Sequence, residues 1–230
     1  MEAVLLSTTY FGPVQWYQKL HRAEYVQMEQ WESFQKQTYR NRCLIATTQG
    51  IQALTVPTER GGSPLIKDTR ISDHGNWRHL HWNALQSAYG ESPFFEYYQD
   101  DIRPFFEHRW DYLLDFNEVI RTKICDLIDI QPKVSYSLEF RTESLEFATA
   151  ISSSDGTAAA NSQFSILNSQ LIKDFRSAIC PKHPMPDPDF EPKPYYQVYQ
   201  QKHGFLPNLS ILDLLFNMGP EAIFVLQKEN

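Results

Sequence analysis

The first thirty residues carry the pattern that most limits what this chain can fold into. The apolar run Val4-Leu5-Leu6 precedes a polar loop, and Pro13 stands where a helix can begin, because its fixed φ angle suits the first helical turn. Residues 25–28 alternate as a strand does, and before them apolar residues recur at helical spacing, at Val14, Tyr17 and Leu20. This order predicts a βαβ unit with parallel strands, in which ligands bind beyond the carboxyl ends of the strands, here at the loop 7–13.

A β-hairpin is predicted next. Residues 42–48 and 51–56 are rich in strand-forming side chains, and they flank Gln49-Gly50, where glycine allows the positive φ angle of a tight turn. Pro57 ends the second strand. The glycines and prolines that follow, up to Asn76, favour a loop around a short strand at residues 65–67.

The middle of the chain, from about residue 76 to residue 130, is predicted to be mainly helical. Asn76 can cap a helix that ends near Gly90, and a break near Pro104 divides the helical stretch from residue 93 to about residue 129. The apolar face of the first helix comprises Trp77, Leu80, His81, Ala84, Leu85 and Ala88. The apolar face of the last helix in this section comprises Leu113, Phe116, Ile120, Ile124 and Leu127.

A strand and two irregular segments follow the helices. The alternation from Val134 to Phe140 predicts a strand with one exposed face. Residues 152–157 have the small polar composition of a flexible loop. Six prolines between Pro181 and Pro194 rule out a regular helix there and favour an extended surface segment.

The end of the chain is predicted to hold one more helix. Ser210 and Asp213 have the spacing of a capping box before an apolar run, and Gly219-Pro220 ends the helix that this run forms. We expect residues 222–226 to return to the sheet as a strand.

These segments predict a mixed α/β fold, with the N-terminal βαβ unit and the hairpin in a mixed sheet and a helical middle section. A chain of 230 residues can bury a substantial core. We expect one domain over residues 1–230, although a domain with a sizeable insertion is the alternative.

Charge and cysteine content limit the partners and the compartment. The net charge of −7 argues against a nucleic-acid-binding surface, which needs clustered lysines and arginines. Cys43, Cys125 and Cys180 are odd in number and far apart, which favours reduced thiols and the cytoplasm. We expect no export signal, because Glu2 stands where such a signal carries positive charge, and no run of eighteen apolar residues predicts a membrane-spanning helix.

We expect the functional surface at the run Lys36-Gln37-Thr38-Tyr39-Arg40-Asn41-Arg42. It places three cations and three hydrogen-bonding side chains just before a predicted strand. If the run is extended, Lys36, Thr38, Arg40 and Arg42 face one way, and the arginine forks suit a phosphate or a carboxylate. The alternative, which composition alone favours, is a solvated edge whose arginines pair with nearby acids.

Other chemical signals in the sequence are weak. His79 and His81 would point about 200° apart on a helix and cannot converge on one metal ion, so we expect no metal site there and a hydrogen-bonded core role for His81. No nucleophile elbow, P-loop, dinucleotide fingerprint or zincin motif is present. The residues therefore name neither a catalytic group nor a cofactor.

An ordered set of segments spans nearly the whole chain. It comprises Tyr10-Phe11-Gly12-Pro13-Val14-Gln15-Trp16-Tyr17, residues 36–42, Gly50, Leu54-Thr55-Val56-Pro57, Trp77, His81-Trp82, Ser92-Pro93-Phe94-Phe95 and residues 208–213. This combination resembles the WbqC-like protein family. The resemblance implies a bacterial cytoplasmic protein and a transferase that decorates a sugar of a surface polysaccharide of the O-antigen type.

Two hypotheses about function are open. The first is a transferase that binds an anionic activated donor, such as a nucleotide-sugar or an acyl donor. The second is a non-enzymatic accessory protein of a polysaccharide assembly complex, with the proline-rich segment and exposed aromatic residues as its contact surface. For the first, the candidate substrate-binding residues are Tyr10, Trp16, Lys36, Tyr39, Arg40, Asn41, Arg42, Trp77, His81 and Asn208.

Overall fold

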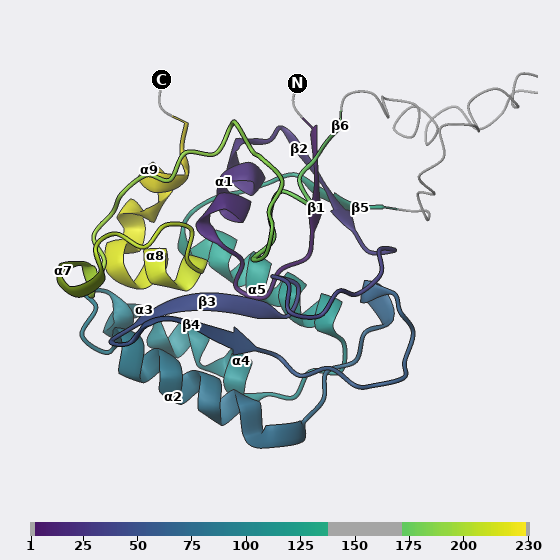
Figure 1. Cartoon of the computed structure of the whole chain (residues 1–230), viewed down its shortest axis with the longest axis horizontal. Coiled ribbons are helices and arrows are strands. Elements are labelled where there is room, and N and C mark those ends of the chain that lie inside the picture. Colours follow the sequence, from purple (N-terminus) through teal and green to yellow (C-terminus); the bar gives the residue numbers. More distant parts are fainter. Residues whose placement is uncertain (1–2, 138–171, 229–230) are drawn as a thin grey trace, which may run out of the picture.

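The computed structural model describes residues 3–137 and 172–228, and it contains a sheet of parallel strands (Figure 1). Their order across the sheet is β5-β2-β1-β6. The strands are β1 (Ala3–Ser7), β2 (Tyr25–Glu29), β5 (Val134–Tyr136) and β6 (Ile172–Asp174). The predicted mixed α/β class is confirmed.

The N-terminal βαβ unit is confirmed. Helix α1 (Val14–Arg22) joins β1 to β2, and the two strands pair in parallel from Ala3 beside Tyr25 to Ser7 beside Glu29. Pro13 is the residue before the helix. Nearly every residue of β1 is buried, because a central parallel strand is covered on both faces.

The predicted hairpin is also present. β3 (Arg42–Thr47) and β4 (Gly50–Thr55) pair antiparallel, and Gly50 has the positive φ angle, 107°, that the turn requires. These strands pair only with each other within the described chain, so the hairpin forms a second, two-stranded sheet. In Figure 1 it lies between helix α2 below it and the parallel sheet with α1 above it.

The helical middle section is confirmed in its outline. Its helices are α2 (Trp77–Tyr89), α3 (Phe95–Ile102), α4 (Pro104–Glu107) and α5 (Leu113–Leu127). α2 is followed by Gly90, and a break falls at Pro104 as expected. Leu80, however, is 58% exposed, because the buried face of α2 runs through Trp77, His81, Leu85 and Ala88.

Three local expectations in this region and at the C-terminus are wrong. Asn76 precedes α2 in a left-handed conformation, and its side chain makes no capping hydrogen bond. The short strand expected at residues 65–67 is a 3-10 turn, η1 (Ile66–Asp68), followed by a second turn, η2 (His74–Asn76). Residues 222–226 form helix α9 (Ala222–Leu226), because a short apolar run has no periodicity that separates strand from helix.

The C-terminal part of the chain is mainly helical. Its helices are α7 (Gln200–His203), α8 (Ile211–Met218), the 3-10 turn η3 (Gly219–Glu221) and α9, of which α8 and α9 pack against α1. Ser210 caps α8, since its hydroxyl accepts a hydrogen bond from the Leu212 N–H at 3.3 Å. Gln18 and Arg22 of α1 donate side-chain hydrogen bonds to the carbonyls of Val225 and Leu226.

The proline-rich segment 181–194 contains neither helix nor strand, as expected. It is nevertheless anchored to the core by Asp187, whose carboxylate bonds the Lys19 ammonium and the Gln15 amide at 2.8 Å each. Strand β5 covers the start of the strand expected at residues 134–140. β5 ends before Ser137, while residues 138–140 of the expected strand and the loop at residues 152–157 lie outside the described part of the chain.

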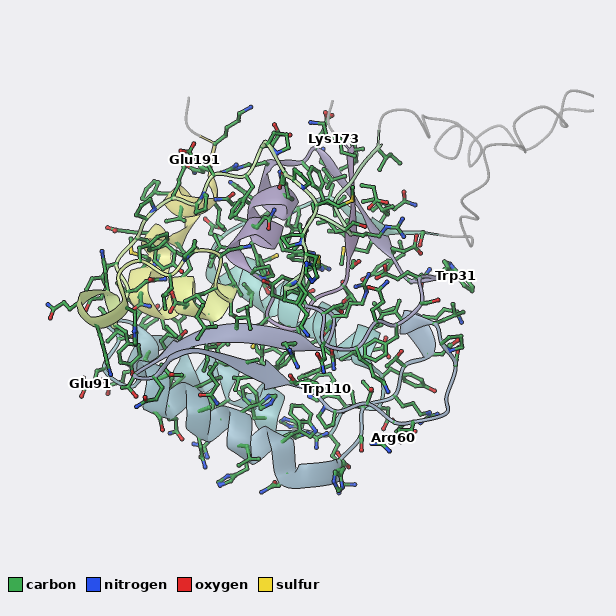
Figure 2. The ribbon with its side chains drawn as sticks, viewed as in Figure 1. Trp31, Arg60, Glu91, Trp110, Lys173 and Glu191 are labelled. Atoms are coloured by element: carbon green, nitrogen blue, oxygen red, sulfur yellow. The ribbon has the colours of Figure 1, made fainter. Side chains whose placement is uncertain are left out.

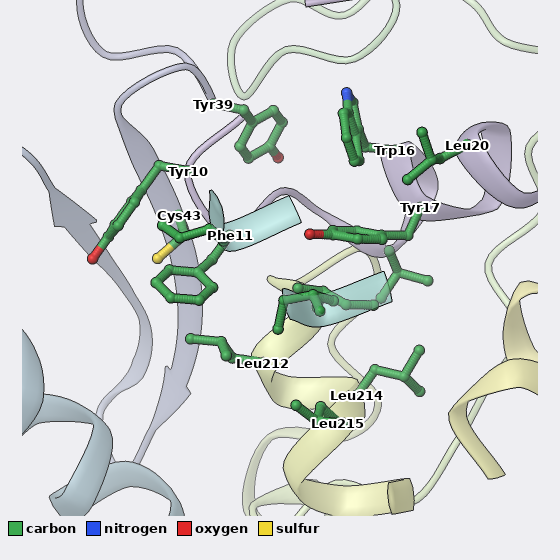
Figure 3. Close-up of a cluster of buried hydrophobic side chains, with 14 of the residues drawn as sticks. Tyr10, Phe11, Trp16, Tyr17, Leu20, Tyr39, Cys43, Leu212, Leu214 and Leu215 are labelled. Carbon is green, nitrogen blue, oxygen red and sulfur yellow. The ribbon is translucent and has the colours of Figure 1, made fainter. Parts of the chain in front are cut away.

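One hydrophobic core joins the sheet, the hairpin and the C-terminal helices (Figure 3). Aromatic rings dominate it, and Tyr10, Phe11, Trp16 and Tyr17 are each at most 1% exposed. Leu212, Leu214 and Leu215 of α8 close the same cluster. This packing holds the loop after β1 between the hairpin and the helices.

Candidate functional site

The strand order of the parallel sheet indicates where a ligand is expected. β1 has β2, the next strand in the chain, on one side and β6, from the C-terminal part, on the other. The strand order therefore reverses at β1, and in open α/β sheets ligands bind outside the carboxyl ends of the strands at such a point. Ser7 is the last residue of β1, and Asp174 is the last residue of β6.

Polar and charged side chains gather at this edge of the sheet. They come from the ends of the strands and from the loops that follow them. We call them the carboxyl-edge cluster, which consists of Ser7, Glu29, Glu32, Arg40, Ser137 and Arg176.

Arg40 and Glu32 form a buried ion pair within this cluster. The Arg40 Nε donates to one carboxylate oxygen at 2.7 Å and Nη2 to the other at 2.5 Å, with side-chain exposures of 6% and 9% for Arg40 and Glu32. The Ser7 hydroxyl accepts a bond from Arg40 at 2.8 Å and donates one to Glu32 at 3.1 Å. Arg40 therefore pairs with a nearby acid, as the alternative expected, but the pair is buried in the fold and not solvated.

Glu29 is the second buried carboxylate and is only 2% exposed. Its Oε1 accepts hydrogen bonds from the Ser137 hydroxyl and from the Trp31 N–H, both at 2.7 Å. Its other oxygen, Oε2, accepts no hydrogen bond from the described residues. An ionised carboxylate with an unoccupied oxygen can accept a proton.

Arg176 brings a second guanidinium to the same edge. Its Nε and Nη2 donate to the Asp174 carboxylate at 3.0 Å and 2.6 Å. These bonds raise the pKa of Arg176, and the negative charges of Asp174, Glu32 and Glu29 raise it further, although burial opposes the shift. Arg176 lines a small cavity together with Ser7 and Arg40. With 26% of its side chain exposed, Arg176 reaches solvent, whereas Arg40 does not.

A small cavity of about 10 Å³ lies between the ends of β1 and β6. That volume holds about one water molecule. The hydroxyls of Thr8 and Thr9 in its wall are buried and have no hydrogen-bond partner among the described residues. Gly12 allows the loop to fold this tightly, because a Cβ atom there would lie 2.4 Å from the Thr9 Oγ1.

Three of the predicted site residues line this cavity: Trp16, Tyr39 and Arg40. The Trp16 indole N–H donates to the Ser7 carbonyl at 2.9 Å, so the ring supports the end of β1. Tyr39 is buried, and its backbone carbonyl accepts a hydrogen bond from the Tyr10 N–H. The structure therefore joins part of the predicted run to the loop after β1.

Tyr10, Trp77 and His81 meet at a different place. The Tyr10 hydroxyl and the His81 Nδ1 are 2.9 Å apart, and the Trp77 and His81 ring centroids are 5.2 Å apart. Burial lowers the pKa of His81 to about 4, so the ring is neutral near pH 7. Figure 3 shows the Tyr10 ring directed away from Trp16 and Tyr39.

The other predicted residues hold backbone segments in place or face solvent. Asn41 donates to the Val56 carbonyl, Arg42 to the Thr55 hydroxyl, and Asn208 accepts from the Gln15 N–H, each at 2.9 Å. Lys36 is exposed. The run from Lys36 to Asn41 is not extended but forms turns, with Gln37 at a φ angle of 61°, so the expected alternation of its faces is wrong.

Sequence reasoning missed Glu29, Glu32 and Arg176. Glu29 directly follows the predicted strand at residues 25–28, and the rule that ligands bind at carboxyl ends of strands could have identified it. The sequence did not indicate Arg176 in this way, because the strand that precedes it, β6, has only three residues and was not predicted.

Across residues 3–137 and 172–228, no group of three histidine, cysteine or acidic side chains is placed to hold an ion. Cys43, Cys125 and Cys180 are free thiols. None of the helices in the described ranges combines the length and apolar character that crossing a bilayer requires.

Comparison with known proteins identifies the family. The model of the WbqC-like protein family matches residues 8–224. An uncharacterized protein of Mycobacterium tuberculosis, Rv1507c, is 28% identical over 197 residues, which cover 82% of this chain and 81% of that protein. No solved structure gives a significant match. The chain belongs to the WbqC-like protein family.

Proposed function

We propose that the protein is a cytoplasmic transferase that binds an anionic, activated donor at the carboxyl-edge cluster, in the synthesis of a bacterial surface polysaccharide. The donor class is a nucleotide-sugar or an acyl donor. One observation carries the proposal: the guanidiniums of Arg40 and Arg176, each paired with a carboxylate, line one cavity where the strand order reverses. Polysaccharide synthesis rests on the resemblance to the family alone.

Donor binding is assigned to Arg176 and to the hydroxyls of Thr8 and Thr9. Arg176 is the guanidinium that reaches solvent, and a phosphate oxygen can replace the Asp174 carboxylate on its fork. The two hydroxyls have no partner among the described residues, so they can donate to the same anion. Because the cavity holds only about one water, donor binding requires the Arg176–Asp174 contact to open.

Glu29 is assigned the role of general base. An O–H or N–H group of the acceptor attacks the electrophilic carbon of the donor, and a new bond forms between that carbon and the acceptor heteroatom. The bond from the carbon to the leaving group breaks, and its electron pair departs on the leaving group. The acceptor proton moves to the Glu29 Oε2, which no described group occupies.

A binding experiment tests this proposal. Nucleoside diphosphates, nucleotide-sugars and acyl-coenzyme A are titrated into the full chain by calorimetry, with thermal shift as a second measurement. We expect one class to bind wild-type protein and Arg176→Gln to weaken that binding by about tenfold, because one charge-assisted contact is lost.

Arg60→Gln is the matched control. Arg60 is an exposed residue on the loop after the hairpin (Figure 2), and its substitution removes the same charge away from the cluster. The proposal fails if no compound of the panel binds wild-type protein, or if the two variants bind the active compound equally well.

The accessory-protein hypothesis has one observation in its favour. Met185, within the proline-rich segment, is 61% exposed, and Tyr196, just after it, is 51% exposed. These two side chains are available for contact with a partner. Copurification from the native host tests this hypothesis, and recovery of the protein without a stable partner would count against it.

A further inference from the structure

A second and larger cavity lies away from the carboxyl-edge cluster. It has a volume of about 420 Å³, which is within the range of small-molecule sites. The start of α2 and helix α4 form it, below the hairpin in Figure 1. The cavity is lined by Asp73, Asn76, Arg78, His79, Trp82, Arg103, Phe106, Glu107 and Arg109.

The lining carries more positive than negative charge. Arg78 and Arg109 share one carboxylate, that of Asp73, at 2.6 Å and 3.4 Å. Arg103 pairs with Glu107 at 2.6 Å. Three guanidiniums therefore face two carboxylates, in a chain whose net charge is −7. This local reversal of sign favours an anion.

Two donor nitrogens of Arg78 have no acceptor among the described residues. Its Nη1 bonds Asp73, while Nε and Nη2 are buried without a hydrogen-bond partner among the described residues. Its guanidinium carbon lies 4.6 Å from the centre of the Trp77 ring. Because these two nitrogens expose almost no surface, an anion in the cavity can bond them only if the guanidinium turns toward the cavity.

An apolar wall stands beside these charges. The rings of Trp82 and Phe106 pack with centroids 5.9 Å apart, and both side chains line the cavity. A flat or apolar group gains contact area and stacking on such a wall. The site therefore combines an anion-binding end with an aromatic surface.

We propose that this cavity binds a small ligand through an anionic group, a phosphate or a carboxylate, while the aromatic or apolar body of the ligand lies against Trp82 and Phe106. The anion contacts Arg78 and Arg109. This site is separate from the donor site at the ends of β1 and β6.

Phenyl phosphate is the probe that tests the proposal, with benzoate and inorganic phosphate as comparison arms. Calorimetric titration of wild-type protein should show saturable binding of phenyl phosphate, and weaker binding of inorganic phosphate, which lacks the ring. Arg109→Gln should weaken the binding by about fivefold to tenfold. Since 83% of the Arg109 side chain is exposed, this substitution leaves the fold intact. If benzoate binds as tightly as phenyl phosphate, the cavity accepts anions in general. If benzoate binds more weakly than phenyl phosphate, the cavity is specific for a phosphate group.

Fluorescence gives an independent measurement. Stacking of the probe on Trp82 should change the tryptophan emission of wild-type protein, and Trp82→Phe should remove most of that change while a hydrophobic wall remains. Arg60→Gln and Arg176→Gln should bind the probe like wild type, which separates this site from the donor site. The proposal is overturned if phenyl phosphate does not saturate, or if Arg109→Gln and Arg60→Gln bind it equally.

Discussion

Asp213 is a fully buried carboxylate that holds several segments together. Its Oδ1 accepts a hydrogen bond from the Tyr89 hydroxyl at 2.9 Å, and its Oδ2 accepts from Tyr195 at 2.7 Å and from Gln197 at 2.9 Å. Burial raises the pKa of Asp213, and these three donors oppose that shift. The residue thus links α8 to α2 and to the segment before α7.

Replacing Asp213 should reveal how much this network stabilises the fold. Asp213→Ala leaves three buried donors without an acceptor, and we expect a loss of about 3–5 kcal/mol in the free energy of unfolding. Asp213→Asn keeps the shape and one carbonyl oxygen, so its loss should be smaller, about 1–2 kcal/mol. Urea unfolding followed by circular dichroism measures both values.

Asp126→Ala is the control for these variants, because Asp126 is exposed on α5. It should change the free energy of unfolding by less than about 0.5 kcal/mol. A loss for Asp213→Ala no larger than that of the control would show that the network contributes nothing.

At the scale of elements, the end of α8 depends on Gly219. This residue has a φ angle of 54° and a ψ angle of −130°, a combination that is strained for any residue with a Cβ atom. A Cβ atom at this position would also lie 2.5 Å from the Phe94 ring. Glycine therefore allows the chain to turn from α8 into η3 while the Phe94 ring packs against that turn.

Gly219→Ala should destabilise the protein by about 1–3 kcal/mol from backbone strain, plus the cost of moving the Phe94 ring. Thermal and urea unfolding measure the change. Gly62→Ala is the matched control, because no atom lies within 4 Å of a Cβ atom built there. Equal stability of the two variants would refute this account of the turn.

At the scale of the whole molecule, stability should depend on pH through His81. Burial lowers its pKa from 6.5 to about 4, so the unfolded chain binds more protons than the folded chain between these values. The contribution of His81 to the free energy of unfolding is therefore fully present above about pH 6.5 and is lost as the pH falls toward 4. His21 is shifted in the same direction by burial and contributes to the same trend.

Lowering the pH from 7 to 5 should reduce the free energy of unfolding by about 2 kcal/mol through His81 alone. Urea unfolding at both pH values measures this loss. His81→Gln has no titrating ring, so its loss over the same range should be smaller by about that amount. His74→Gln, at an exposed turn, should behave like wild type. If wild type and His81→Gln lose the same free energy of unfolding between pH 7 and pH 5, His81 is not the group responsible.

The sequence by itself determined the local elements of this protein. β1, α1, β2 and the hairpin follow from short-range patterns, because periodicity and turn residues act within a few positions of the chain. The helical middle section and its break at Pro104 follow for the same reason. Where a segment is too short to have a period, as in α9 and η1, the sequence did not decide between strand, helix and turn.

Only the tertiary structure decided which charges meet. Arg40 was predicted as part of a local run, but its partner Glu32 and its neighbour Ser7 are brought to it by turns and by strand pairing. Ser137 and Arg176 join Glu29 at one edge because β5 and β6 add to opposite sides of the sheet. A buried charge needs a partner, and no local pattern specifies which distant segment supplies it.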